Sequence, residues 1–182
     1  MTKKDELLEA AEQRVRTGGY DNFSFRDLAN DVGIKSASVH YHFPTKAKLG
    51  AELVKRYTQR FLENLGEPQN PNGKHANPIQ AYIDMFRTAL LVEKQMCLCG
   101  LLGAESDGLP EEVKFETKTF FERNLEWLEK AFDLTKSNST LESRVEAERL
   151  LCALEGAMLI SKSMDNIAIF NNVVAPYLSI PD

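Results

Sequence analysis

Apolar residues recur along most of the chain with the spacing of an α-helix, not with the alternation of a strand. In residues 5–17 the apolar side chains lie three or four positions apart, and the pair Gly18-Gly19 then ends the pattern. No segment alternates convincingly between apolar and polar residues, so the sequence predicts an all-α protein of about nine helices. The other eight helices are expected over residues 25–31, 35–40, 46–65, 79–93, 97–103, 111–134, 141–164 and 167–178.

Local signals mark several of these boundaries. Ser24 and Asp27 have the spacing of a capping box, in which a hydroxyl and a carboxylate satisfy early backbone N–H groups. Gly33 permits a tight turn, and Thr45 is a plausible N-cap for the helix that follows. Residues 66–78 contain three prolines, two glycines and three asparagines, which predicts a loop.

Composition places the chain among globular proteins. Of its 182 residues, 43% are hydrophobic and 27% are charged, which excludes collagen-like and globally disordered chains. The longest uncharged apolar run, residues 96–104, is too short to span a membrane, and no apolar stretch follows the N-terminal lysines as in a secretory signal. Three cysteines, an odd number, favour a reducing compartment, so we expect a cytoplasmic protein.

The charge is distributed unevenly. The net charge is −5, but residues 1–50 contain eight Lys/Arg and seven Asp/Glu, a balance of +1, which leaves −6 for residues 51–182. A locally basic head on an acidic body is a weak sign of an anion-facing surface, and ordinary scatter explains the asymmetry equally well.

The segment from Ser24 to Leu49 has the layout of a helix-turn-helix, because two short helices are joined by a turn that contains Gly33. The expected core positions are Phe25, Leu28, Ala29, Val32, Ile34, Val39 and Phe43. The second helix then presents small, polar and aromatic side chains that suit a DNA major groove. A plain helical hairpin with a polar face is the alternative reading of this layout.

The same segment carries an ordered series of motifs. They are Gly18-Gly19-Tyr20, Ser24-Phe25-Arg26-Asp27-Leu28-Ala29, Val32-Gly33-Ile34 and Ser38-Val39-His40-Tyr41-His42-Phe43-Pro44-Thr45-Lys46-Ala47-Lys48-Leu49. This series resembles the N-terminal domain of the tetracycline-repressor (TetR) family of bacterial regulators, over about residues 5–55. The run Tyr-His-Phe-Pro-x-Lys-x-x-Leu is the most specific part of the match.

The resemblance implies a DNA-binding set, namely Ser24, Arg26, Lys35, Ser36, Ala37, Ser38, His40, Tyr41, His42 and Lys46. Ser24 would cap its helix and touch phosphate, and Arg26 would reach a base edge or the adjoining backbone. The residues from Lys35 to Ser38 would face the groove, and Lys46 would add its charge and the helix dipole to a phosphate. Lys35 departs from the family, which often has a capping serine there, so a relative's half-site does not transfer to this chain.

Two rival chemistries are less well supported. His40 and His42 lie two residues apart on a helix, so their side chains point about 200° apart and cannot share a metal ion. The chain has no Glu-x-x-His pair, glycine-rich phosphate loop or Gly-x-Ser-x-Gly motif, so we expect no metal, no cofactor and no enzyme. Cys97-Leu98-Cys99 is either a thiol sensor or a pair of small packing residues in a short helix.

The acidic body is expected to bind a small molecule and a second copy of the chain. The candidate ligand-binding residues are Phe86, Leu90, Phe120, Phe121, Asn124, Leu151 and Met158. The candidate dimer-interface residues are Leu154, Ile167, Phe170, Val174 and Tyr177. The last two helices are apolar on more than one face and therefore need two partners.

These patterns predict a DNA-binding domain over residues 1–48 and an effector-binding and dimerisation domain over residues 49–182. We expect a repressor that binds a palindromic operator in double-stranded DNA as a homodimer and is released by a mostly hydrophobic, neutral or weakly cationic effector. The alternative is a redox-sensing regulator that uses its cysteines, or a small helical enzyme.

Overall fold

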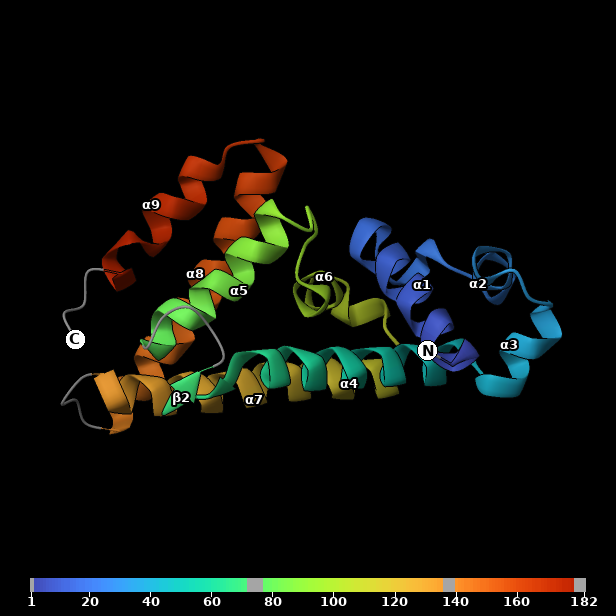
Figure 1. The fold of residues 1–182 in the computed structure, drawn as a ribbon, viewed down its shortest axis with the longest axis horizontal. Coiled ribbons are helices and arrows are strands. Elements are labelled where there is room, and N and C mark those ends of the chain that lie inside the picture. Colours follow the sequence, from blue (N-terminus) through green and yellow to red (C-terminus); the bar gives the residue numbers. More distant parts are fainter. Residues whose placement is uncertain (1, 72–76, 136–139, 179–182) are drawn as a thin grey trace. The chain divides into compact units, whose positions relative to one another are not determined.

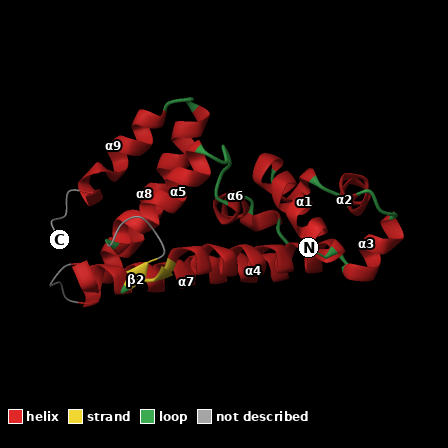
Figure 2. Ribbon diagram, in the orientation of Figure 1, coloured by secondary structure: helices red, strands yellow, loops and turns green. Residues whose placement is uncertain are grey.

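The computed structural model describes residues 2–71, 77–135 and 140–178. Within these ranges the chain is almost entirely helical (Figure 2), which confirms the all-α prediction. The described α-helices are α1 (Lys3–Gly18), α2 (Phe25–Val32), α3 (Ser36–His42), α4 (Lys46–Leu65), α5 (Pro78–Leu91), α6 (Leu98–Ala104), α7 (Glu111–Thr135), α8 (Thr140–Ser163) and α9 (Ile167–Leu178). Two 3₁₀ turns, η1 (Tyr20–Asn22) and η2 (Ser106–Gly108), complete the helical elements. No helix in these ranges combines the length and apolarity that a membrane crossing requires.

One short strand pair lies in the segment that was expected to be a loop. Strands β1 (Gly66–Glu67) and β2 (Asn70–Pro71) pair in antiparallel register. Gly66, the first residue of β1, has φ +77, a conformation that glycine adopts without steric cost, so the chain can leave the helical path directly after α4. Two-residue strands are too short to produce an alternating pattern, so the sequence could not reveal them.

Capping interactions explain where the first helices begin. In α2 the expected capping box is present: the Asp27 amide donates to Ser24 Oγ at 3.3 Å, and the Ser24 amide donates to the Asp27 carboxylate at 2.9 Å. A second capping box joins Thr2 and Asp5, so α1 starts at residue 3 and not at residue 5 as the apolar spacing suggested. Gly33 ends α2 in the left-handed conformation, with φ 68 and ψ 40.

The chain forms two compact units. The first comprises Met1–Gln59 with Cys97–Phe120, and the second comprises Arg60–Met96 with Phe121–Asp182. Residues 1–48, the expected DNA-binding domain, lie wholly within the first unit.

The core of the first unit lies between α1, α2 and α3 and extends along the early part of α4. Its apolar side chains include Leu7, Leu8, Ala11, Val15, Phe23, Leu28, Val39, Phe43, Leu49 and Leu53, all of which are buried. This core also encloses an ion pair between Arg16 and Glu12, with 3.4 Å between Nη1 and Oε1. The guanidinium of Arg16 lies over the Tyr57 ring, 5.8 Å from its centroid, which supplies a second partner for a charge that would be costly to bury alone.

In the second unit, α8 and α9 pack against each other, and α5 packs against both (Figure 1). An aromatic cluster of Phe61, Tyr82, Phe86 and Trp127 fills part of its core, with centroid separations of 5.6 to 6.1 Å. The Trp127 indole N–H donates to the Gly66 carbonyl at 2.7 Å, so the ring is held at its polar edge as well as by packing.

Candidate nucleic-acid interface

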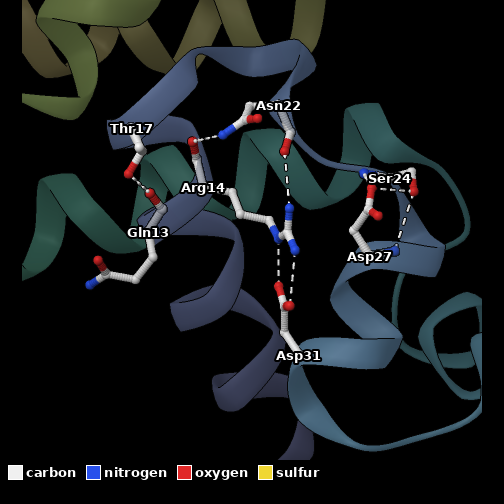
Figure 3. Close-up of polar contacts among 7 residues, drawn as sticks. All are labelled: Gln13, Arg14, Thr17, Asn22, Ser24, Asp27 and Asp31. Atoms are coloured by element: carbon white, nitrogen blue, oxygen red, sulfur yellow. Dashed lines mark hydrogen bonds and ion pairs between the residues drawn. The ribbon is translucent and has the colours of Figure 1, made fainter.

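The helix-turn-helix is held together by a small buried core and one ion pair. Leu28 and Ala29 of α2 and Val39 of α3 are buried, as is Phe43 directly after α3. Arg14 of α1 binds both carboxylate oxygens of Asp31 at the end of α2, with 2.9 Å between Nη2 and Oδ1 (Figure 3). A bidentate pair of this kind restrains orientation as well as distance, so it sets how α2 lies against α1.

The loop between α1 and α2 is also tied to α1. The Asn22 side-chain amide donates to the Arg14 carbonyl at 2.9 Å, and the Arg14 guanidinium reaches back to the Asn22 carbonyl (Figure 3). Hydrogen bonds from Arg14 hold the pKa of Asp31 below its usual range. Hydrogen bonds with Ser24 lower the pKa of Asp27 in the same way. Both carboxylates of α2 therefore stay ionised and are engaged in hydrogen bonds within the N-terminal helices.

The exposed face of α3 carries most of the residues expected to contact DNA. Lys35, Ser36, Ala37, His40 and Tyr41 are exposed, whereas Ser38 and His42 are half-buried. Tyr41 is 85% exposed, which is unusual for so large a ring and leaves it available to a partner. The opposite side of α3 is anchored in the core, because Val39 is fully buried.

Three expected core positions are only half-buried: Phe25, Val32 and Ile34. Phe25 packs edge-on against the His40 ring, with centroids 4.7 Å apart. Phe25 therefore supports His40, a candidate DNA-contact residue, at the edge of the core. The fully buried core of the helix-turn-helix contains fewer residues than the sequence predicted.

Among the candidates outside α3, Ser24 and Lys46 already have partners inside the chain. The Ser24 hydroxyl serves the capping box, while Arg26, two residues further on, is exposed. Lys46 Nζ donates to Asp21 Oδ1 at 3.0 Å and lies 4.6 Å from the centroid of the Tyr20 ring. The Asp21 side chain is fully exposed, so this ion pair is weak and its ammonium can exchange to a phosphate.

The start of α3 lacks a side-chain cap. Lys35 occupies the N-cap position and makes no capping hydrogen bond. The first N–H groups of α3 therefore receive no side-chain cap, and Lys35 itself is exposed. Asp27 and Asp31 are engaged by Ser24 and Arg14, and the cations Arg26 and Lys35 are exposed in the same region.

Comparison with known proteins identifies this arrangement. The profile described as "Bacterial regulatory proteins, tetR family" matches residues 7–53, which contain α2, the Gly33 turn and α3. Residues 7–53 of this chain are therefore similar to the DNA-binding segment of the TetR family. The biofilm operon icaADBC negative transcriptional regulator IcaR of Staphylococcus aureus is 36% identical over 52 residues, which are 29% of this chain and 28% of IcaR. The match thus covers little more than a quarter of the curated relative.

Solved structures extend the likeness over the whole TetR fold. A TetR transcriptional regulator from Legionella pneumophila is 29% identical and superposes with a TM-score of 0.88, covering 95% of this chain and 94% of the other. A TetR-family regulator from Agrobacterium tumefaciens, also 29% identical, gives 0.80 over 97% and 95%.

The seven candidate ligand-binding residues do not all fall in one unit of the chain. Phe86, Leu90, Asn124, Leu151 and Met158 are buried in the second unit, where Phe121 is half-buried. Phe120 belongs to the first unit, with its ring 5.7 Å from that of Tyr57. Neighbours on a helix point about 100° apart, so Phe120 and Phe121 cannot line the same wall. Asn124 is anchored, since its Oδ1 accepts from Tyr82 Oη at 2.8 Å.

The expected dimer-interface residues are largely interior to the single chain. Leu154, Phe170 and Val174 have no exposed surface, and Ile167 and Tyr177 are half-buried. The packing of α9 on α8 and α5 covers these side chains. In the part of α8 whose side chains the structure describes, the exposed large apolar residues are Val145, Leu159 and Ile160, and Met164 directly after the helix is exposed as well.

The two cysteines considered as a sensor are both buried. Cys97 and Cys99 are 2% and 0% exposed, and the Tyr57 hydroxyl lies 3.9 Å from Cys97 Sγ. A reactive thiol needs access to solvent, so this geometry favours the packing interpretation. Burial also raises the pKa of Tyr57 well above its usual value, so its hydroxyl stays protonated. Among the described residues, no three of the His, Cys, Asp and Glu side chains gather as a metal site would require.

Proposed function

We propose that this protein is a DNA-binding transcriptional repressor of the TetR family that acts as a homodimer on a palindromic operator. The observation that carries the proposal is the exposed face of α3. It presents a hydroxyl, a methyl group, an imidazole and a phenol on a helix that is fixed from behind by Val39. Groups of this kind read base edges and sugar-phosphate in a major groove.

Exposure divides the candidates into two roles. Ser36, Ala37 and His40 are exposed on α3 and would read bases, with the Ala37 methyl suited to a thymine methyl. Tyr41 and Lys46 would bind phosphates, as would His42 beside the Tyr41 ring. The cations Arg26 and Lys35 add attraction for the DNA backbone in a protein whose net charge is otherwise negative.

Dimerisation follows from the small size of one head. A single seven-residue recognition helix contacts few bases, whereas two heads one helical turn apart, about 34–36 Å, would read a palindrome. The exposed apolar residues Leu159 and Ile160 of α8, together with Met164 directly after it, offer a surface that a second copy would cover. The name of IcaR, a negative regulator, favours repression over activation.

We further propose that a mostly hydrophobic effector releases the operator. The support is the composition of this core: the apolar rings of Tyr82 and Phe86, with the Asn124 amide beside Tyr82, are residue types that small-molecule sites use. Helix α4 continues without interruption from Lys46 to Leu65, so a displacement of its later turns would move the start of the helix beside the head. A hundredfold preference of the effector for the released state would supply about 2.7 kcal/mol. We place this regulator in the cytoplasm.

The test is selection of bound duplexes from a random pool, followed by fluorescence anisotropy with the enriched sequence. Tyr41→Ala should weaken binding about tenfold, the loss expected for one phosphate contact. Phe115→Ala, which removes another exposed aromatic ring from α7, is the matched control and should leave affinity unchanged. Ser36→Ala should change which base is preferred at one position of each half-site. Failure to enrich any duplex, or equal affinity of Tyr41→Ala and the wild type, would refute the proposal.

A further inference from the structure

An open pocket of about 590 Å³ lies within the second unit, where the ends of α5 and α8 meet the start of α9. Its apolar wall consists of Leu90, Leu91 and Ile167. The volume lies within the range of small-molecule sites. Of the seven residues expected to bind an effector, this pocket contains only Leu90, so it is a different place from the aromatic cluster discussed above.

Ser161 lines this pocket and has an unused hydroxyl. Its side chain is 3% exposed, and its Oγ has no hydrogen-bond partner. A serine within a helix often donates to a carbonyl one turn earlier, as Thr58 does to Val54 in α4. Ser161 makes no such bond, although a buried hydroxyl without a partner costs free energy. A ligand that accepts a hydrogen bond at this point would remove that cost.

Two lysines place positive charge around the same pocket. Lys94 and Lys162 both line it, and Lys162 Nζ donates to the Lys94 carbonyl at 2.5 Å. An ammonium group has three donors, so this bond leaves two for a ligand.

One acidic group opposes the lysines. Asp165 also lines the pocket, so its charged groups are two ammoniums and one carboxylate, with Asn166 as a neutral neighbour. The N-terminus of the twelve-residue helix α9 adds partial positive charge at the same place. The balance favours an anion over a cation, and the apolar wall favours one that has a hydrocarbon part.

We propose that this pocket binds a small amphiphilic carboxylate. The carboxylate would accept from the Ser161 hydroxyl and the Lys162 ammonium, while a short hydrocarbon tail would cover Leu90, Leu91 and Ile167. This assignment holds whether or not the protein binds DNA, because it rests only on groups of the second unit.

The experiment is isothermal titration calorimetry on the full chain without DNA, using hexanoate as the probe. Hexanol and hexylammonium share its tail and serve as matched ligands. Hexanoate should bind saturably with a dissociation constant on the order of 1 mM, as its few heavy atoms allow. Hexanol and hexylammonium should bind at least about tenfold more weakly, since they lack the carboxylate that pairs with lysine. Absence of saturable hexanoate binding, or equal or tighter binding of either matched ligand, would overturn the proposal.

Two serine variants test the site itself. Ser161→Ala should weaken hexanoate binding about tenfold, the loss expected for one hydrogen bond to a charged group. The substitution removes an unpartnered hydroxyl, so the thermal midpoint should not fall. Ser163→Ala changes an exposed serine two residues further along α8 and should leave affinity unchanged. Equal hexanoate affinity of Ser161→Ala and the wild type would place binding elsewhere. Operator binding is measured separately, so failure here leaves the proposed function standing.

Discussion

At the end of α1, the carboxylate of Glu105 occupies the space that a side chain at Gly19 would need. This contact can be tested by substitution. Gly19 has φ 80 and ψ −177, a region that is essentially restricted to glycine. A Cβ atom at Gly19 would lie 1.8 Å from Glu105 Oε1. The other oxygen of Glu105 accepts from the Tyr20 amide at 2.8 Å. Glycine at this position therefore allows the residue after α6 to hold the turn after α1.

The cost of Gly19→Ala has two parts. Forcing a residue with a Cβ into this backbone conformation costs about 1–3 kcal/mol of unfolding free energy. The displaced Glu105 also loses its hydrogen bond to Tyr20, which we value at about 1 kcal/mol because Glu105 is exposed. Gly19→Ala should thus cost about 2–4 kcal/mol and Glu105→Ala about 1 kcal/mol. In the double variant the hydrogen bond is lost only once, which predicts a coupling of about 1 kcal/mol.

Urea unfolding followed by circular dichroism measures these differences. Gly108→Ala is the control, because a Cβ at Gly108 in η2 meets nothing within 4 Å, and it should change stability by less than about 0.5 kcal/mol. If the losses of unfolding free energy for Gly19→Ala and Glu105→Ala add exactly in the double variant, the hydrogen bond of Glu105 to Tyr20 does not depend on glycine at position 19. A Gly19→Ala protein as stable as Gly108→Ala would refute the steric argument as a whole.

Four further results are expected. Three follow from charge and exposure on the surface, and one from the pH dependence of an ion pair. Lys46→Ala should weaken binding to every duplex and reduce the salt slope of log affinity by about 0.9; an unchanged slope in anisotropy titrations would remove Lys46 from the phosphate contacts. Ile160→Glu should give a folded monomer in sedimentation velocity, because this side chain is 48% exposed in the single chain; persistence of the dimer would move the interface elsewhere. Cys152 is exposed, unlike the other two cysteines, and should react first with a thiol reagent in the native protein, as mass spectrometry of digested fragments would show. The bond from Arg14 lowers the pKa of Asp31, so its stabilisation is complete above the ordinary aspartate pKa of about 3.9 and is lost as the pH falls through the folded value. The difference in unfolding free energy between the wild type and Asp31→Asn should therefore shrink from about pH 5 to about pH 2, and a difference that grows on acidification would contradict the pairing.

Local signals in the sequence were sufficient for the helices and for the nature of the N-terminal helix-turn-helix. The capping box of Ser24 and Asp27 and the left-handed Gly33 are interactions within four residues, and both are present as predicted. Helices α4 and α9 have the expected bounds, 46–65 and 167–178. These features depend on neighbours in the chain, so a short window of sequence contains all the information that determines them.

The sequence alone could not assign partners to the apolar and polar faces of the helices. Helical spacing shows that Phe170 belongs on a buried face, but burial by α5 and α8 within the chain and burial by a second copy produce the same pattern. Likewise, Asp21 lies 25 residues from Lys46 and Glu105 lies 85 residues from Tyr20, yet each pair is in contact. Only the packed structure brings such groups together, because periodicity specifies the face of a helix and tertiary packing decides what that face meets.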